Sequence, residues 1–253
     1  MEAFSILFAK EMREQWRSLR LISIVGIFAG LGIMSPLLAR YTPEIVGAMA
    51  GSRLAAAMPA PSAPDAVDQF LKNIGQFGAL AAILVAMGMV AYDRERGTAA
   101  FVLTKPAARA TYLAAKLAAL ATLLGAGVAV AGVGAWVYTA LLFQPLSPAG
   151  FVAACGLIWL LLFTYASLTF LGSTVAPSVV VAAAVGFGGL VLGGIAAAIP
   201  GVGGNTPAAL SGAARAFALG IPARDISGPL AASVAVSGVC LLLAWRIFER
   251  QEL

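Results

Sequence analysis

The sequence contains no histidine, only two cysteines and few charged residues. Without histidine, the chain cannot form a Ser-His-Asp triad, a histidine-liganded zinc site or a histidine proton relay. Charged residues make up 11% of the 253 residues, whereas soluble domains carry about 25%. Hydrophobic residues make up 61%, which is more than a soluble domain of this length can bury. The composition therefore indicates a chain that folds in a lipid bilayer.

Two further absences limit the function. No G-x-x-x-x-G-K-[ST] loop occurs, so the chain is not expected to bind ATP through a Walker motif. No acidic pair falls inside the expected membrane spans, and the acids nearest a span end are Asp93, Asp225 and Glu249. The third apolar run itself begins at Leu117, so no lysine lies within an apolar run, although a span that starts near residue 110 includes Lys116. Because intramembrane charges mark ion paths and proton relays, their absence argues against an ion-coupled carrier.

Serines within the spans have no activating partner for nucleophilic catalysis. We therefore expect their hydroxyl groups to bond to the backbone or to a neighbouring helix. Hydroxyl groups and apolar side chains along the fourth span would line any path through the protein, which suits a lipophilic or amphipathic cargo. The serines are Ser167, Ser173, Ser233 and Ser237, and the expected lining residues are Thr164, Tyr165, Ser167, Thr169 and Ser173.

Six apolar stretches are long enough, or nearly so, to cross a hydrocarbon core of about 30 Å as helices. The expected fold is an all-α membrane protein with six transmembrane helices, built as one domain over residues 1–253. The expected spans are residues 21–39, 74–92, 110–143, 151–174, 179–199 and 229–247.

Basic residues predict the orientation of these spans. If the N-terminus is cytoplasmic, 11 of the 16 basic residues lie on the cytoplasmic side, as the positive-inside rule favours. Six spans then return the C-terminus to the cytoplasm. The 11 residues are four in 1–20 (Lys10, Arg13, Arg17, Arg20), five in 94–116 (Arg94, Arg96, Lys105, Arg109, Lys116) and two in 246–250 (Arg246, Arg250).

Residues 1–20 have the period of an amphipathic helix that lies in the membrane interface. Apolar residues recur every three or four positions from Phe4 to Leu19, with charged residues mostly between them. Tryptophan and arginine side chains suit the headgroup level. The alternative is a solvated helical start of the first span. The residues expected in the interface are Phe4, Phe8, Lys10, Arg13, Trp16 and Arg17.

Two glycine pairs have the small-xxx-small spacing that lets helices approach closely in lipid. Gly26 and Gly30 lie in the first span, and Gly189 and Gly193 lie in the fifth. They can form a dimer or gate seam, or pack within one chain, and both interpretations stay open.

The two long outer loops, residues 40–73 and 200–228, are expected to form a small lid. In the first, Asp65 can be the N-cap or a first-turn acid of a helix that leads into the second span. In the second, Thr206 can cap a short helix with Pro207 in its first position, and Gly220 can end that helix.

The connector at residues 93–109 gathers an unusual density of polar residues between two apolar runs. Thr98 can cap a short helix over 99–103, and Lys105-Pro106 ends it because the residue before proline disfavours helical backbone. Phe101, Val102 and Leu103 would give this helix an apolar face. Such a face suits docking into a groove of another protein. The alternative is a solvated hairpin whose charges set the topology.

The stretch "ERGTAAFVLTKPAARATYLAAK" resembles the signature of ABC type-2 transporter permeases. That signature reads Glu, a basic residue, Gly-Thr, a short hydrophobic stretch, Pro, two residues, Arg, and a Lys about seven residues later. The family often has Glu-Leu or Leu-Leu where this chain has Phe101-Val102. The matching residues are Glu95, Arg96, Gly97, Thr98, Leu103, Pro106, Arg109 and Lys116.

The resemblance implies a permease subunit that pairs with a second copy or a paralogue and with two copies of a separate ABC ATPase. The ATPases would bind ATP and Mg, so this chain would need no cofactor and would not itself be an enzyme. The segment 98–103 would be the coupling helix, and Glu95, Arg96 and Arg109 the polar contacts that fix it. The coupling residues implied are Glu95, Arg96, Gly97, Thr98, Phe101, Val102, Leu103, Lys105, Pro106 and Arg109.

The resemblance also implies export, or mechanical work on partners, in the cytoplasmic membrane of a bacterium or archaeon. Membrane lipids are expected partners, nucleic acid is not, and an accessory extracytoplasmic protein is compatible with this reading. A non-transporting membrane scaffold or assembly factor is the main alternative function. The third candidate function is an intramembrane enzyme or secondary carrier. The absence of histidine and the absence of charges inside the apolar runs weigh against it.

Overall fold

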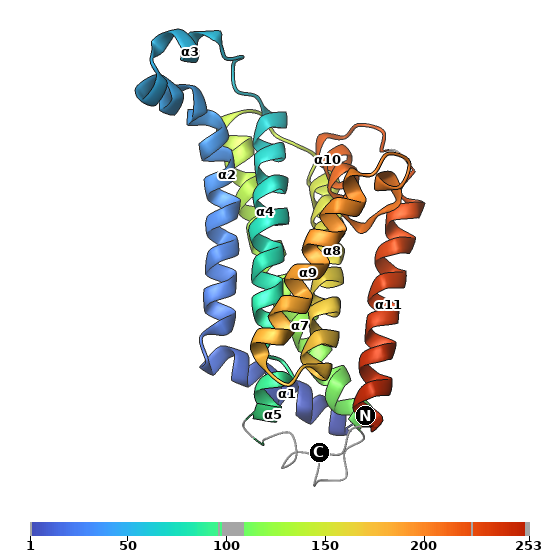
Figure 1. Cartoon of the computed structure of the whole chain (residues 1–253). Helices are drawn as coiled ribbons and strands as arrows, with labels where there is room; N and C mark the ends of the chain where they lie inside the picture. The colour runs from blue at the N-terminus through green and yellow to red at the C-terminus, as the bar shows by residue number, and fades with distance from the viewer. Residues whose placement is uncertain (1, 96, 98–108, 224, 251–253) are drawn as a thin grey trace.

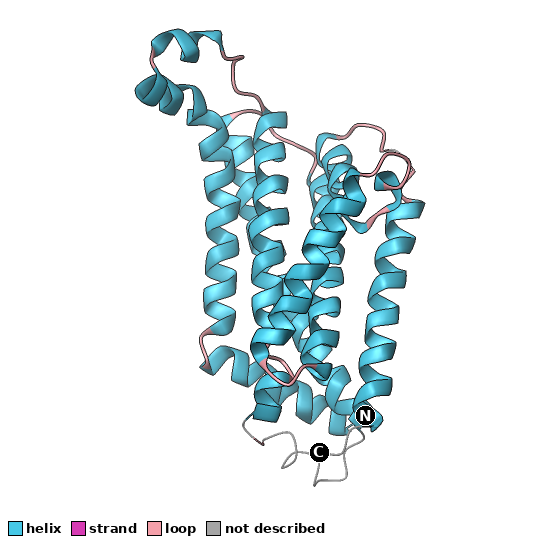
Figure 2. Cartoon of the chain, in the orientation of Figure 1, coloured by secondary structure: helices cyan, strands magenta, loops and turns pink. Residues whose placement is uncertain are grey.

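The computed structural model describes residues 2–95, 97, 109–223 and 225–250. Every regular element in these ranges is a helix, and none is a strand (Figure 2). Six segments are long and apolar enough to cross a membrane, which confirms the predicted fold class. The spans are α2 (Arg20–Ala50), α4 (Ala63–Ala86) continued by α5 (Ala91–Glu95), α7 (Arg109–Leu142), α8 (Pro148–Val175), α9 (Val179–Ala198) and α11 (Ser227–Arg250) (Figure 1).

Helix α1 (Glu2–Arg17) lies across one end of the bundle, named here the α1 end (Figure 1). A corner at Leu19, whose φ of 59° is rare for a residue with a side chain, separates α1 from α2. The side of α1 that is buried carries Glu11 and Gln15, whereas Trp16 is 60% exposed. Trp16 and Phe4, which is 39% exposed, therefore lie on the side of α1 away from the bundle, where lipid can cover them. Phe4 stacks on Phe8 at 6.1 Å, and Lys10, Arg13 and Arg17 are exposed.

Two spans extend further than their apolar runs. Helix α2 continues to Ala50 through Pro36 and Pro43. Hydroxyl groups next to both prolines, on Ser35 and Thr42, donate to carbonyls one turn earlier, at 2.6 and 2.5 Å.

Helix α4 begins at Ala63 because the Asp65 carboxylate accepts from the backbone N–H and the hydroxyl of Ser62, at 2.9 and 2.6 Å. Asp65 is thus a first-turn acid, and Ser62 is the N-cap.

Helix α8 lies in the middle of the packing and contacts α4, α7, α9, α11 and the short helix α10 (Leu210–Leu219). Helix α2 packs on α7 and α4. Phe28 of α2 is fully buried against Gly127, where a Cβ would lie 3.0 Å from the Phe28 ring. Backbones approach even more closely at Gly32, whose added Cβ would lie within 3 Å of Ala131 backbone atoms. Small residues thus set the helix spacing on this side of the bundle.

The two glycine pairs differ in their surroundings. Gly189 and Gly193 of α9 pack within the chain, against Leu168 and Tyr165 of α8. Nothing lies within 4 Å of a Cβ built on Gly26 or Gly30, so that pair faces outward from α2. Packing within one chain therefore accounts for the pair in α9 and not for the pair in α2.

The opposite end of the bundle, named here the α10 end, is covered by short helices (Figure 1). After α9, the 3-10 turns η1 (Gly203–Asn205) and η2 (Pro207–Ala209) lead into α10. Gly220 ends α10 in the left-handed conformation, at φ 67°, as predicted. The predicted cap is wrong, because the Thr206 hydroxyl donates to the Gly203 carbonyl at 2.8 Å and does not cap the turn. Short helix α3 (Ser52–Ala57) projects beside this end, beyond α2 (Figure 1).

Candidate functional site at the α1 end

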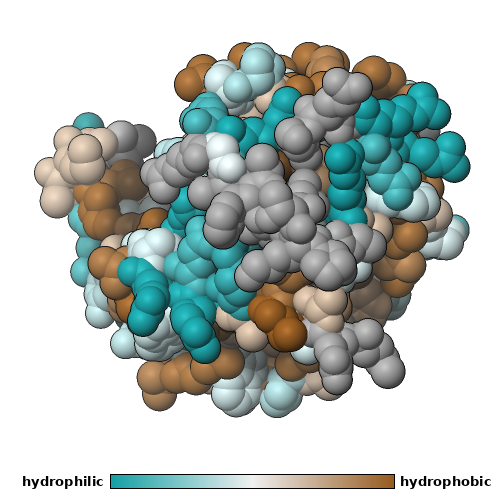
Figure 3. Space-filling model, turned by 90° about the horizontal axis from the view of Figure 1, so that it is seen from below, coloured by the Kyte–Doolittle hydropathy of each residue, from teal (hydrophilic) through white to brown (hydrophobic). Residues whose placement is uncertain are grey.

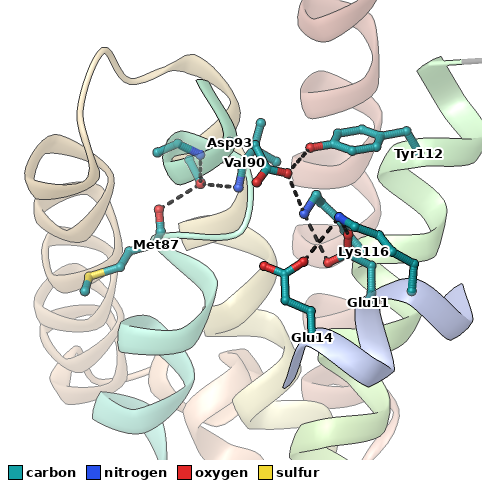
Figure 4. A network of polar contacts seen from close by, with 10 residues as sticks. Glu11, Glu14, Met87, Val90, Asp93, Tyr112 and Lys116 are labelled. Carbon is teal, nitrogen blue, oxygen red and sulfur yellow. Dashed lines mark hydrogen bonds and ion pairs between the residues drawn. The ribbon is translucent and has the colours of Figure 1, made fainter. Parts of the chain in front are cut away.

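A buried cluster of charges joins three elements at the α1 end (Figure 4). Lys116 of α7 is only 3% exposed in its side chain. Its ammonium nitrogen lies 3.1 Å from Glu11 Oε2 of α1 and 2.9 Å from Asp93 Oδ2 of α5. One ammonium group therefore bridges two carboxylates from helices far apart in the sequence. Removing one member of a buried ion pair leaves an uncompensated charge, which is strongly destabilising.

Neighbouring side chains complete this cluster. Tyr112, one turn before Lys116, donates its hydroxyl to Asp93 Oδ2 at 2.5 Å, and its ring centroid lies 5.1 Å from the ammonium nitrogen. The same ring stacks on Phe248 of α11 at 5.8 Å. Lys10 adds a second cation, 3.0 Å from Glu11 and 3.2 Å from Glu14. Burial opposes its charge, but the two carboxylates outweigh that effect and raise the pKa of Lys10.

The expectation that intramembrane charges are absent is wrong for Lys116. Helix α7 begins at Arg109, so Lys116 sits two turns inside a span-length helix. Asp93 also belongs to a span, because α5 continues α4. From the sequence, both were counted as cytoplasmic charges, although the expected span 110–143 includes Lys116, and Glu11 and Tyr112 were not identified as their partners. The i, i+4 spacings of Tyr112 with Lys116 and of Glu11 with Gln15 place each pair on one helix face but do not indicate which helix it meets.

A break in the second span lies beside this cluster. Between α4 and α5, the Ser173 side chain of α8 enters the helix backbone. Its hydroxyl donates to the Met87 carbonyl at 2.8 Å and accepts from the N–H groups of Val90 and Ala91, at 3.1 and 3.0 Å (Figure 4). One hydroxyl thus satisfies three backbone groups that the break would otherwise leave unpaired.

The other span serines also follow the prediction that they bond to the backbone or to a neighbouring helix. Ser167 and Ser233 donate to carbonyls one turn earlier, and Ser237 donates to Thr164 of α8. Of the expected path-lining residues, Thr164, Ser167, Thr169 and Ser173 are buried. Only Tyr165 of that set is partly exposed.

The start of the connector is held by the ends of α8 and α9. Arg94 donates to the carbonyls of Thr174 and Ala176 at the C-terminus of α8, at 2.9 and 3.4 Å. The Glu95 carboxylate accepts from the Val179 N–H, at the first residue of α9, at 3.0 Å. Each charge has the sign that complements its helix end. Residues 94 and 95 are therefore bonded to the ends of both α8 and α9.

The end of the connector is held by α11. Arg109, the first residue of α7, donates to the carbonyls of Phe248 and Glu249 at 3.2 and 3.0 Å. These carbonyls belong to the last turn of α11, where a cation is favourable. The two flanks of residues 96–108 are thus bonded to different helices.

Several predicted coupling residues fall between these flanks. Gly97 is described and has a φ of 68°, in the left-handed region that favours glycine. The remainder lie outside the described residues: Arg96, Thr98, Phe101, Val102, Leu103, Lys105 and Pro106.

The surface at this end is mixed in polarity. Seen from below, hydrophilic side chains form several patches across it, and hydrophobic ones gather mainly toward the edge (Figure 3).

Among the described residues, no group of three or more His, Cys, Asp or Glu is placed to hold a metal ion.

Residues 5–218 match the family model described as "ABC-2 family transporter protein". The chain is also 31% identical over 193 residues to the "Uncharacterized transmembrane protein YxlG" of Bacillus subtilis (strain 168). That alignment covers 74% of each protein. The matched region includes the charge cluster, both flanks of the connector and five of the six spans.

Proposed function

Since this chain belongs to the ABC-2 family of transporter proteins, we propose that it couples ATP hydrolysis on a separate ATPase subunit to movement of its own spans. The family supports the coarser role of a multi-pass membrane permease that is not itself catalytic. The observation that carries the finer proposal is the bonding of the connector flanks. Glu95 is bonded to α9 and Arg109 to α11, so the connector can act on both helices.

In this proposal the ATPase binds residues 98–103. Closure of the ATPases around ATP and Mg displaces the connector. Arg94 and Glu95 pass this displacement to the ends of α8 and α9, and Arg109 passes it to α11. The ion cluster of Lys116 with Glu11 and Asp93 carries α1 along with α5 and α7.

The α1 end would face the cytoplasm. This orientation places the basic-rich segments and the connector on the side where an ATPase finds ATP. The complex would hold two permease chains, identical or paralogous, and two ATPases, in the cytoplasmic membrane of a bacterium or archaeon. The outward-facing glycines of α2, Gly26 and Gly30, are available for contact with the second permease. The work done would be export of a cargo or mechanical rearrangement of a partner.

An aspartate substitution test addresses the docking step. Phe101→Asp with Leu103→Asp would put two charges on the apolar face of the coupling segment. Because buried apolar anchors dominate interfaces, we expect affinity for the natural ABC ATPase to fall at least about tenfold. Co-purification and binding measurements with the detergent-solubilised permease give this number.

Val202→Asp is the matched control, since Val202 is half exposed at the α10 end. It should leave ATPase binding unchanged. If the double variant binds the ATPase and hydrolyses ATP like the wild type, the coupling assignment is wrong, and the membrane-scaffold alternative gains support.

A further inference from the structure

A groove lies between the second, fourth and fifth spans at the α10 end. It has a volume of about 420 Å³, within the range of small-molecule sites, and it is open rather than enclosed. Helix α10 forms its upper wall. Tyr165 of α8, one of the expected path-lining residues, lines it, and no residue of the charge cluster does.

The groove is polar at one end and apolar at the other. Lys72 of α4 and Arg215 of α10 lie at its mouth with Asp68, and Leu71, Leu161 and Leu190 line it from three different helices. Leu161 and Leu71 are buried. This polarity fits an amphiphile whose headgroup meets the cations and whose chain lies on the leucines.

The charge at the mouth favours an anionic headgroup. Arg215 is bonded to both carboxylate oxygens of Asp68, at 2.5 and 3.1 Å, so those two charges offset each other. Lys72 is exposed, and the described residues give it no ion-pair partner. Asp65, about two turns before Lys72, accepts two hydrogen bonds from Ser62. Lys72 and the remaining guanidinium N–H groups of Arg215 are thus available to a phosphate.

The source of the ligand is the bilayer. Leu190 of the groove continues into the outward face of α9, where Val191 and Leu192 are 60% and 67% exposed. In a membrane that face contacts acyl chains, so a lipid can enter sideways without crossing water.

The groove has its depth because two lining positions lack side chains. Gly75 of α4 and Gly212 of α10 line it, and nothing lies within 4 Å of a Cβ built on either one. A larger side chain at Gly75 would therefore fill the groove without a clash of its Cβ with the fold.

We propose that this groove binds one anionic phospholipid, with its phosphate at Lys72 and Arg215 and one acyl chain along Leu71, Leu161 and Leu190. The proposal concerns the permease chain alone. The binding test below includes no ATPase, so its result does not depend on whether the chain couples to one.

Native mass spectrometry of the detergent-solubilised chain tests this site, with phosphatidylglycerol and phosphatidylcholine of equal chain length as probes. The wild type should bind phosphatidylglycerol about fivefold more tightly, as expected for one basic residue near an anionic lipid. Lys72→Gln should remove that preference. Gly75→Leu should reduce binding of both lipids at least about tenfold while retaining the fold, since leucine favours helix over glycine.

Two controls match these variants. Gly156→Leu adds the same side chain on the exposed face of α8, again with nothing within 4 Å of its Cβ. Arg40→Gln removes an exposed cation outside the groove. Both should bind the two lipids like the wild type. Equal binding of the two lipids by the wild type, or unchanged binding by Gly75→Leu, would overturn the proposal.

Discussion

Replacement of Lys116 by methionine is expected to lower the free energy of unfolding by about 3–5 kcal/mol. The reason is that Glu11 and Asp93 would remain in place without the ammonium group that lies 3.1 and 2.9 Å from them. For a chain of this size the loss corresponds to a fall in Tm of roughly 6–20 °C. Thermal unfolding in detergent, followed by circular dichroism, measures it.

A compensating variant separates the effect of charge on stability from the effect of lost packing. Lys116→Met combined with Glu11→Gln and Asp93→Asn also removes the two carboxylate charges that Lys116 compensates and should recover most of the lost Tm. Arg40→Met, at an exposed cation, should change stability by less than about 0.5 kcal/mol. A Lys116→Met variant as stable as the Arg40→Met variant would show that the ion cluster does not hold α1 to the bundle.

Replacement of Ser173 by alanine is expected to cost about 2–6 kcal/mol, because it leaves at least two buried backbone groups without a partner, at about 1–3 kcal/mol each. The groups are the Met87 carbonyl and the N–H of Val90 or Ala91. The same thermal measurement applies, and hydrogen exchange at residues 87–91 should rise because the break loses its support.

Ser167→Ala is the control on the same helix. Ser167 is also fully buried, but its hydroxyl only adds a bond to the Phe163 carbonyl of its own helix. Its replacement should cost less than about 1 kcal/mol. Equal losses for the two serines would mean that Ser173 does not support the break between α4 and α5.

The spans could be predicted from the sequence because each is a local apolar run, and the bilayer requires every backbone group to be satisfied within a helix. The ends of the spans were predicted less well. Helix α4 starts at Ala63, eleven residues before the expected span, because the helix predicted at Asp65 is continuous with that span and is stabilised at its start by the Ser62–Asp65 box. Helix α2 passes two prolines that would normally suggest a helix end.

The charge cluster could not be predicted, because its members are distant in sequence. Glu11 is 105 positions from Lys116, and a single sequence does not reveal which charges meet. Lys116 follows Arg109 closely, so the pattern suggested a charge that sets topology. The period of α1 predicted an amphipathic helix, but it did not show that Glu11 and Gln15 form the buried side. Contacts between helix ends, such as Glu95 with Val179, likewise depend on how the helices pack.

The central claim is that the connector flanks move α9 and α11. It is tested most directly by the distance between spin labels on cysteines introduced by Val191→Cys on α9 and Val239→Cys on α11, two exposed positions. Free Cys155 and Cys240 are replaced by alanine, and one permease copy per ATPase complex is labelled. The proposal predicts a distance change on ATP binding that is lost in Glu95→Ala/Arg109→Ala and kept in Arg246→Ala, which removes an exposed cation of α11. An unchanged ATP-dependent shift in the Glu95→Ala/Arg109→Ala complex would contradict it.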